Sequence, residues 1–269
     1  ADRTAARLGK ATHSLSSGDR WFRAALAAEF QAHARVPAAS LLAVAASAAG
    51  EGGRLRSSAS VVGVGLDFFS LAPRPFMPTN LTGDAVYVNP TCAARLGLSP
   101  GDELTLRLEP PGALPRDVPI ADAEEGLIPL RLTVAEVLTD ERFGGFDLAL
   151  HQVPSPRIFI ARERLAEALG KPGRANTLLV CAPRATSPEL ERALSACWAL
   201  ADLGLTLVSN GALGHLELRS EHVFLDEAVE ANPASRRAGI NYEAWSKAIS
   251  KKALIESQVP ILTVSGRVE

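Results

Sequence analysis

The sequence predicts an α+β fold in which two similar segments flank a β-rich insertion. Two observations support this prediction. The order helix, strand, strand occurs near the N-terminus and recurs after residue 176, and three closely spaced prolines at 73–78 precede the β-rich part. We therefore predict a discontinuous α+β subdomain of residues 1–79 and 162–269, with a β-rich subdomain of residues 80–161 inserted between its two halves.

The first half is predicted to begin with an amphipathic helix over residues 21–30. Apolar residues recur there every four positions and share one helix face, and Asp19 precedes them as an N-terminal cap. Strands are predicted at 41–46 and 59–66, although the alanines of the first weaken its strand propensity.

The segment 84–109 opens the insertion and is the most informative stretch of the chain. A short β-branched and aromatic run is followed by Asn-Pro, a short helical patch and a Pro-Gly-Asp turn. Leucines then alternate with polar residues up to Glu109, as in a half-buried strand. This order of elements is typical of small β-barrel-like modules. Further strands are predicted at 130–139 and 157–161, and a proline-rich loop at 110–122.

The second half is predicted to repeat the first with one strand added ahead of it. A helix over 162–169 precedes it and ends at Gly170. Ser187 is assigned as the cap of a helix with proline in its first turn. The remaining predicted elements are strands at 176–182, 205–208, 213–219 and 223–229 and a helix at 242–255. The short apolar run at 259–264 is either a strand or the approach to a hydrophobic segment that has been removed.

Composition excludes several classes of function. Lys and Arg number 28 against 30 Asp and Glu, and aromatic residues make up 5% of the chain, so neither a basic face nor a base-stacking platform for nucleic acid is indicated. No apolar run reaches the roughly 18 residues of a membrane helix. Because the chain begins at Ala1 without a signal peptide, we expect it to be a soluble piece of a longer protein.

The three cysteines do not indicate a metal site. Cys92, Cys181 and Cys197 are widely spaced and form no C-x-x-C pair. We interpret them as small buried hydrophobic residues. One disulfide would still leave a free thiol, and the sequence leaves their disulfide state open.

The densest group of ligand-type residues fits either a metal site or a polar surface strand. His215 and Glu217 would share one face of a strand, with Glu221 and His222 in the following turn. Zinc sites usually need three or four convergent ligands at a recognisable spacing, which is lacking here. We therefore favour a solvated strand and turn and predict no metal ligands.

Nucleotide-binding and nucleophile motifs are also absent. Residues 16–20 (SSGDR) lack the spacing of a P-loop and are interpreted as a cap, and 63–65 (GVG) lacks the third glycine of a dinucleotide fingerprint and a following helix. There is no G-x-S-x-G elbow, and His151 and Gln152 lie in a predicted surface loop. We predict no catalytic residue, no cofactor-binding residue and no cofactor.

Taken in order, several motifs resemble the extracytoplasmic, MacB-like periplasmic core domain of FtsX-like ABC transporter permeases. The resemblance covers nearly the whole chain, and the order of the motifs is more specific than any one of them. The motifs lie at 16–26, 61–69, 86–109, 110–120, 130–140, 153–180 and 218–229.

The resemblance implies a porter-like α+β subdomain with an inserted β-rich, sabre-like subdomain. It further implies a non-catalytic domain on the periplasmic side of a bacterial inner membrane, flanked by membrane helices. Such a domain would transmit ATP-driven motion from the membrane to cargo or partner proteins. The implied partners are a cytoplasmic ABC ATPase, fused or separate, a second permease copy and a periplasmic adaptor or cargo protein. Efflux, lipoprotein release and cell-envelope regulation remain alternatives.

Two other hypotheses remain open. One is an enzyme or cofactor-binding domain of double-psi-barrel type, with a ligand beside Gly101 and Asp102 or a metal at His215 and Glu217. The other is a periplasmic module that binds a small ligand in a cleft between two lobes.

Overall fold

The computed structural model describes residues 7–18, 20–50, 55–109, 127–148, 154–210, 215–220 and 261–264. Helices and strands are mixed along this part of the chain, which confirms the predicted α+β content. Contacts divide the chain into two compact units. Unit 1 comprises Ala1–Asp19 and Ala24–Ala185, and unit 2 comprises Arg20–Arg23 and Thr186–Glu269.

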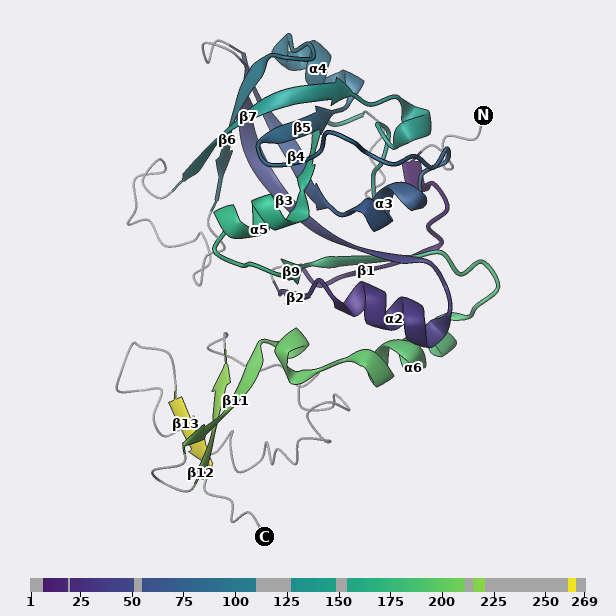
Figure 1. Ribbon diagram of the computed structural model, residues 1–269, viewed down its shortest axis with the longest axis vertical. Helices are drawn as coiled ribbons and strands as arrows, with labels where there is room; N and C mark the ends of the chain where they lie inside the picture. The colour runs from purple at the N-terminus through teal and green to yellow at the C-terminus, as the bar shows by residue number, and fades with distance from the viewer. Residues whose placement is uncertain are drawn as a thin grey trace. The chain divides into compact units, whose positions relative to one another are not determined.

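Unit 1 contains a large sheet with short helices (Figure 1). Its strands are β1 His13–Ser16, β3 Ala38–Ala49, β4 Arg56–Val64, β5 Ala85–Val88, β6 Glu103–Leu108, β7 Ile128–Val137, β8 Arg157–Ala161, β9 Arg174–Ala175 and β10 Thr177–Val180. Its helices are α2 Leu26–Ala34, α3 Leu66–Ser70, α4 Pro90–Leu96, α5 Arg162–Ala168 and the 3₁₀ turn η2 Asp140–Arg142.

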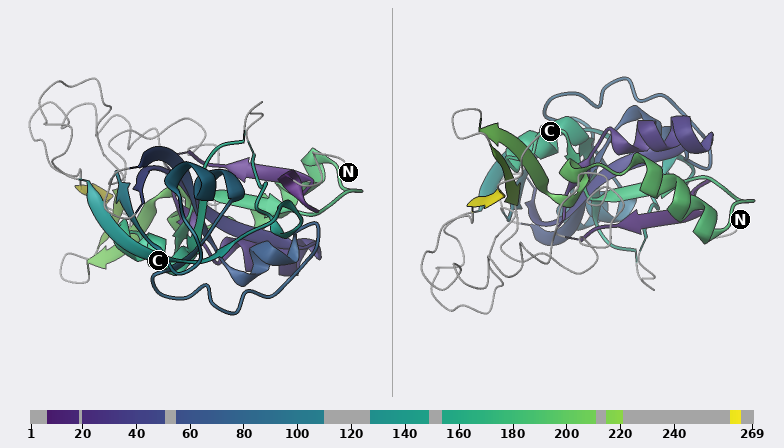
Figure 2. Two further views of the ribbon diagram at one scale, coloured as in Figure 1. Left: turned by 90° about the horizontal axis from the view of Figure 1, so that it is seen from above. Right: turned by 90° about the horizontal axis from the view of Figure 1, so that it is seen from below.

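Six strands of unit 1 close into a barrel. They follow in the order β3, β4, β8, β5, β7 and β6, and β6 pairs again with the end of β3. The pairs β4–β8 and β5–β7 are parallel, whereas the other neighbours are antiparallel. Before it enters the barrel, β3 pairs with β10, and β10 pairs with β1 at the edge of the sheet. Figure 2 shows the same fold from above and from below.

The alternating pattern predicted for the barrel strands is confirmed. On β6 the leucines are buried while the residues between them are half-buried. On β7 Leu130, Leu132 and Val134 are buried, and their neighbours are exposed or half-buried. A barrel strand has one face toward the interior, so its side chains alternate between core and surroundings. The strand, short helix, turn and strand predicted within 84–109 are all present as β5, α4 and β6.

The interior of unit 1 contains a cluster of aromatic rings. Phe68 on α3 is fully buried, stacks on Phe143 with ring centroids 4.5 Å apart, and meets Phe146 edge-on at 5.0 Å. Phe159 of β8 and Phe69 of α3 complete its ring contacts. Segments far apart in the sequence therefore share one aromatic core.

Unit 2 is described by a helix and a small antiparallel sheet. Its elements are β2 Phe22–Arg23, α6 Ser187–Cys197, the 3₁₀ turn η3 Leu200–Leu203, β11 Leu205–Asn210, β12 His215–Ser220 and β13 Ile261–Val264. The sheet order is β11, β12, β13. Along the chain the order helix, strand, strand occurs as α2, β3 and β4 and again as α6, η3, β11 and β12. That these segments form two halves of one subdomain stays a prediction. Of the two alternatives for the run at 259–264, the strand is present, as β13.

Three local predictions are wrong. The first helix begins at Leu26 rather than Trp21, with Ala25 at its N-cap, because Phe22 and Arg23 adopt an extended conformation. Helix α6 is capped by Thr186, not by Ser187; the reciprocal bonds of Thr186 with Glu189 form a capping box. A helix, α3, does follow the GVG segment directly.

The compact units do not follow the predicted subdomain bounds. The barrel takes β3 and β4 from outside 80–161, and both predicted boundaries lie within unit 1. The bounds 80 and 161 therefore stay predictions. The loop predicted at 110–122, the strand at 223–229 and the helix at 242–255 lie outside the described residues. Among the described residues, no helix has the length and apolar character needed to cross a bilayer.

Substitution of the central ring tests the aromatic core. Phe68→Ala is expected to lower the free energy of unfolding of unit 1 by about 3–5 kcal/mol, because it removes a buried ring at the centre of the cluster. Leu66→Ala on the same helix is the control, because Leu66 is 60% exposed; a change within about 0.5 kcal/mol is expected. Urea unfolding followed by far-UV circular dichroism measures both. Equal effects of the two substitutions would contradict the assignment of Phe68 to the core.

Candidate functional site

The Pro-Gly-Asp turn of the LGLSPGDEL motif makes structural contacts. The Asp102 carboxylate accepts a hydrogen bond from the Ser99 N–H at 2.8 Å, and the Asp102 N–H donates to the Ser99 carbonyl oxygen at 3.1 Å. The N–H of Gly101, which has φ +98°, donates to the Val134 carbonyl oxygen on β7. The turn thus ties the start of β6 to β7, and these groups of the motif are used in folding.

Asn89, in the Asn-Pro break of the same motif, joins three elements. Its side-chain oxygen accepts hydrogen bonds from the N–H of Cys92, at the start of α4, and from the N–H of Arg157, at the start of β8, at 2.8 and 3.0 Å. Its amide group donates to the Ser155 carbonyl oxygen at 2.9 Å. A buried amide that is satisfied in this way specifies the local arrangement. This role of Asn89 was not predicted, although asparagine before a proline at the first helical position is a recognised N-cap signal.

The ligand-type residues near the end of β12 are only partly described. His215 and Glu217 lie two positions apart on β12, opposite Asn210 and Val208 of β11. Glu221 and His222 lie outside the described residues, as do His151 and Gln152. Across the part of the chain that the structure describes, no three His, Cys, Asp or Glu side chains are grouped to hold a metal ion.

The two glycine-containing segments have structural roles. The predicted cap at residues 16–20 does not precede a helix: the segment begins at the end of β1, and the Ser17 hydroxyl donates to the Asn176 carbonyl oxygen at 3.1 Å. Gly63 is closely packed, as predicted. A Cβ atom there would lie 3.1 Å from the Arg162 Cα and 3.2 Å from the Leu42 Cβ.

A buried ion pair joins the start of β8 to Asp147 in the segment that precedes it. The Arg157 Nη2 atom lies 3.1 Å from the Asp147 carboxylate, and the two side chains are only 7% and 9% exposed. Burial lowers the pKa of the Arg157 guanidinium, and the nearby Asp147 carboxylate opposes that shift. Arg7 approaches the other Asp147 oxygen at 3.5 Å. One buried carboxylate therefore links β8 to the N-terminal segment.

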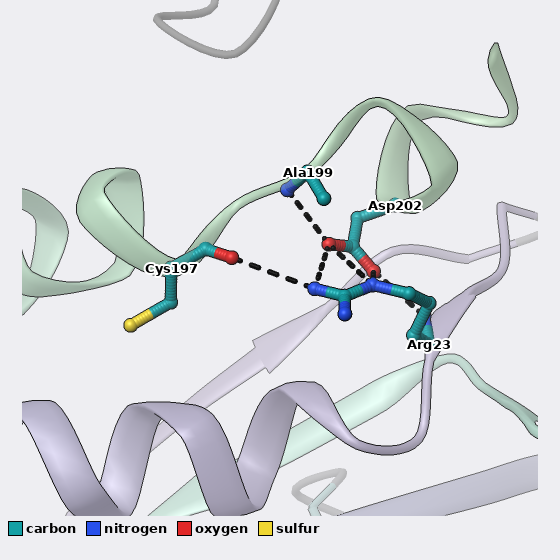
Figure 3. A network of polar contacts seen from close by, with 4 residues as sticks. All are labelled: Arg23, Cys197, Ala199 and Asp202. Atoms are coloured by element: carbon teal, nitrogen blue, oxygen red, sulfur yellow. Dashed lines mark hydrogen bonds and ion pairs between the residues drawn. The ribbon is translucent and has the colours of Figure 1, made fainter. Parts of the chain in front are cut away.

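A second carboxylate organises unit 2 (Figure 3). The Asp202 side chain, in η3, is fully buried. Its two oxygens accept hydrogen bonds from Arg23 Nε at 3.0 and 3.2 Å and from Nη2 at 2.9 Å, and the Arg23 backbone N–H also donates to it at 2.8 Å. The Ala199 N–H donates to the same carboxylate at 2.9 Å, which caps η3. We call Arg23, Ala199 and Asp202 the Arg23–Asp202 anchor.

The anchor holds together two distant parts of the sequence within unit 2. Arg23 belongs to the short segment Arg20–Arg23, whose neighbours on both sides along the chain belong to unit 1. The Cys197 carbonyl oxygen at the end of α6 accepts a further bond from Arg23 Nη2 at 3.5 Å, and Phe22 lies against the ring of Trp198. These contacts explain why residues 22 and 23 are extended: partners about 175 residues away override the local helical pattern.

The cysteines are free thiols, and only Cys92 is fully buried. Cys92 lies on α4, where burial raises the pKa of its thiol from 9.0 to about 11. Cys181 and Cys197 are half-buried. The interpretation as buried hydrophobic residues thus fits Cys92 and is too strong for the other two.

Three comparisons with known proteins place these observations in context. A scan against protein-family models finds no match, and neither does a search of curated proteins. Solved structures do match. The extracellular domain of the noncanonical ABC-type transporter YknZ from Gram-positive bacteria is 9% identical, with a TM-score of 0.42, over 67% of this chain and 88% of that domain.

Two further structures are similar to the same extent. The periplasmic region of MacB from Actinobacillus actinomycetemcomitans is 10% identical, with a TM-score of 0.43, over 70% of this chain and 83% of that one. A permease domain from Porphyromonas gingivalis is 13% identical, with a TM-score of 0.38, over 69% of this chain and 70% of that one. Two of the three are extracytoplasmic regions, and the third is a domain of a permease. They come from the class of proteins that the sequence motifs resemble.

Substitutions in the Arg23–Asp202 anchor are expected to destabilise unit 2. Asp202→Asn and Arg23→Ala should each lower its free energy of unfolding by about 3 kcal/mol, because each removes one member of an ion pair whose carboxylate is fully buried and leaves the other without its partner. Arg192→Ala, on the exposed part of α6, is the control. All three tryptophans belong to unit 2, so urea unfolding followed by tryptophan fluorescence reports on that unit. Unchanged midpoints in both anchor variants would contradict this role.

The buried Cys92 thiol predicts a loss of stability at high pH. Because its pKa is raised to about 11 in the folded protein from 9.0, the folded state binds the proton more tightly, and stability is lost as the pH rises from 9 to 11. The raised pKa of the Cys92 thiol contributes up to about 3 kcal/mol to the free energy of unfolding below this pH range. Cys92→Ala should show a shallower decline across this range in urea unfolding. Parallel pH profiles for the two proteins would contradict the prediction.

Proposed function

We propose that this chain is a non-catalytic extracytoplasmic domain of an ABC-type permease. In this role it transmits ATP-driven motion from the membrane to a periplasmic cargo or partner protein. The partners that follow from the proposal are a cytoplasmic ABC ATPase, a second permease copy and a periplasmic adaptor or cargo. Efflux, lipoprotein release and regulation of the cell envelope remain the candidate outputs.

One observation carries the proposal: the first and the last strand of unit 1 are direct neighbours. His13 at the start of β1 pairs with Val180 at the end of β10. The Thr12 hydroxyl donates to the Val180 carbonyl oxygen at 3.2 Å and accepts from the Ala182 N–H at 2.8 Å. Displacement applied to the beginning of the chain thus acts on the strand that leads into unit 2. A domain that relays movement needs such a direct link.

The polar clusters support the same role. The Asp202 carboxylate, the Asp147 carboxylate and the Asn89 amide each hold together segments that are distant in sequence. A relay needs stiff elements, and buried charges paired in this way resist rearrangement because separating them is costly. The proposal also includes a division into two subdomains. Residues 1–79 and 162–269 would form the porter-like subdomain, and residues 80–161 the sabre-like one.

The barrel gives the double-psi-barrel hypothesis one specific observation in its favour. Closure of six strands around a common interior is a geometry that this hypothesis requires. Against it, the Gly101 N–H and the Asp102 carboxylate, beside which its ligand was expected, bond to Val134 and Ser99 of the chain itself. We therefore keep it as the second candidate.

Protease accessibility in cells tests the location. The parent protein, expressed with a cytoplasmic tag, should lose this domain when protease is added to spheroplasts, while the tag stays protected. Hydrophobic segments of about 20 residues should flank residues 1 and 269 in the reading frame. A domain that is cleaved only after lysis would overturn the proposal. Copurification of an ATPase with the intact permease would identify the motor.

A further inference from the structure

Residues 7–17 form a strap along the edge of unit 1, and we infer that this strap detaches as a unit while the barrel stays folded. None of its residues is fully buried, whereas all four residues of its partner strand β10 are. Segments that bury little apolar surface open at a lower free energy than the core on which they lie. The strap is therefore the part of unit 1 best suited to release.

Among the described residues, contacts run along the whole strap, including bonds from the Lys10 N–H to the Leu71 carbonyl oxygen at 2.7 Å and from the Ser17 N–H to the Asn176 carbonyl oxygen at 2.9 Å. At its start, the Arg7 guanidinium pairs with Asp147, whose N–H donates to the Arg7 carbonyl oxygen at 3.2 Å. In its middle, Gly9 lies directly on the aromatic core. At its end, Thr12 and the β1 ladder bind β10. Most of these contacts are polar or local; the apolar ones are made by Gly9 and by the partly buried Ala11, which pack against the aromatic core.

Gly9 sets how closely the strap approaches the core. It has φ +58°, and a Cβ atom there would lie 2.2 Å from the Leu71 carbonyl oxygen and 2.5 Å from the Phe143 ring. Neither the backbone conformation nor the available space accepts a side chain. The attached position thus depends on a residue without a side chain.

The pairing of Asp147 makes release at Arg7 inexpensive. Asp147 is held by two arginines, and its bond to Arg157 at 3.1 Å remains when Arg7 leaves. The buried carboxylate therefore keeps a partner, and Arg7, already 28% exposed, becomes hydrated. Loss of Arg157 would instead leave a buried charge uncompensated, which is strongly unfavourable. In this cluster the contact of Asp147 with Arg7 can open, whereas its contact with Arg157 persists.

Detachment frees the outer edge of β10 and removes the cover over Phe143. The β1 ladder opens together with the rest of the strap. Its first pair joins His13 to Val180, the residue of β10 nearest to unit 2 along the chain. The next step rests on the proposed function. In that role, the strap is the element that first receives displacement from the membrane.

Hydrogen exchange by mass spectrometry on the full chain tests the strap. Arg7→Ala should speed exchange of the amides in residues 8–17 about tenfold, the effect of losing one charged hydrogen-bonded contact, with no change in β3 or β4. Arg74→Ala is the matched control, because its pair with Glu141 is exposed; a change below about twofold is expected. Equal acceleration in the strap and in β3 and β4 would overturn the inference, as would no acceleration in the strap.

Two further variants separate the strap from the core. Gly9→Ala should show strap exchange close to that of an unstructured peptide while β3 and β4 stay protected; loss of the whole fold would overturn the inference. Asp147→Asn should also speed exchange in β8, because it leaves Arg157 without its carboxylate. Hydrogen exchange does not depend on the cellular location of the protein. The inference about the strap can therefore be contradicted while the proposed location holds, and the reverse.

Discussion

Strand β3 is the element on which the rest of unit 1 depends. Along its twelve residues it pairs first with β10 and then with β6 on one side, and with β4 on the other. Its pairing with β6 closes the barrel, and its pairing with β10 attaches the edge that carries β1. The alanines that weaken its strand propensity suit this position. Ala39 and Ala48 are fully buried, where small side chains let neighbouring elements approach closely.

Buried polar groups then determine how the remaining segments join this framework. Asn89 positions α4 and β8 relative to β5, and Asp202 fixes Arg23 beside η3. Asp147 differs from both because it has two cationic partners of unequal burial. That inequality allows one contact to open while the other continues to compensate the charge. Unit 1 thus combines stiff buried clusters with an edge, residues 7–17, that can detach.

The polar groups of these clusters are used in folding. The Asp102 carboxylate, beside which a ligand was predicted, bonds to the Ser99 N–H of the chain itself. Residues with the strongest interactions, Asp202 and Asp147, were not identified from the sequence. Their side chains join segments about 180 and 140 residues apart, and no local pattern records such a distance.

The sequence by itself determined the local elements and their order. The alternation of leucines in β6, the Asn-Pro start of α4 and the repeated helix, strand, strand order depend on neighbouring residues, so they could be predicted. Barrel closure, the start of α2 at Leu26 and the division into units were decided only by tertiary structure. Closure requires β6 to meet Ala46–Ala49, and Arg23 leaves the helical pattern because Asp202 binds it. Both depend on the free energy of contacts between distant segments, which local propensity does not contain.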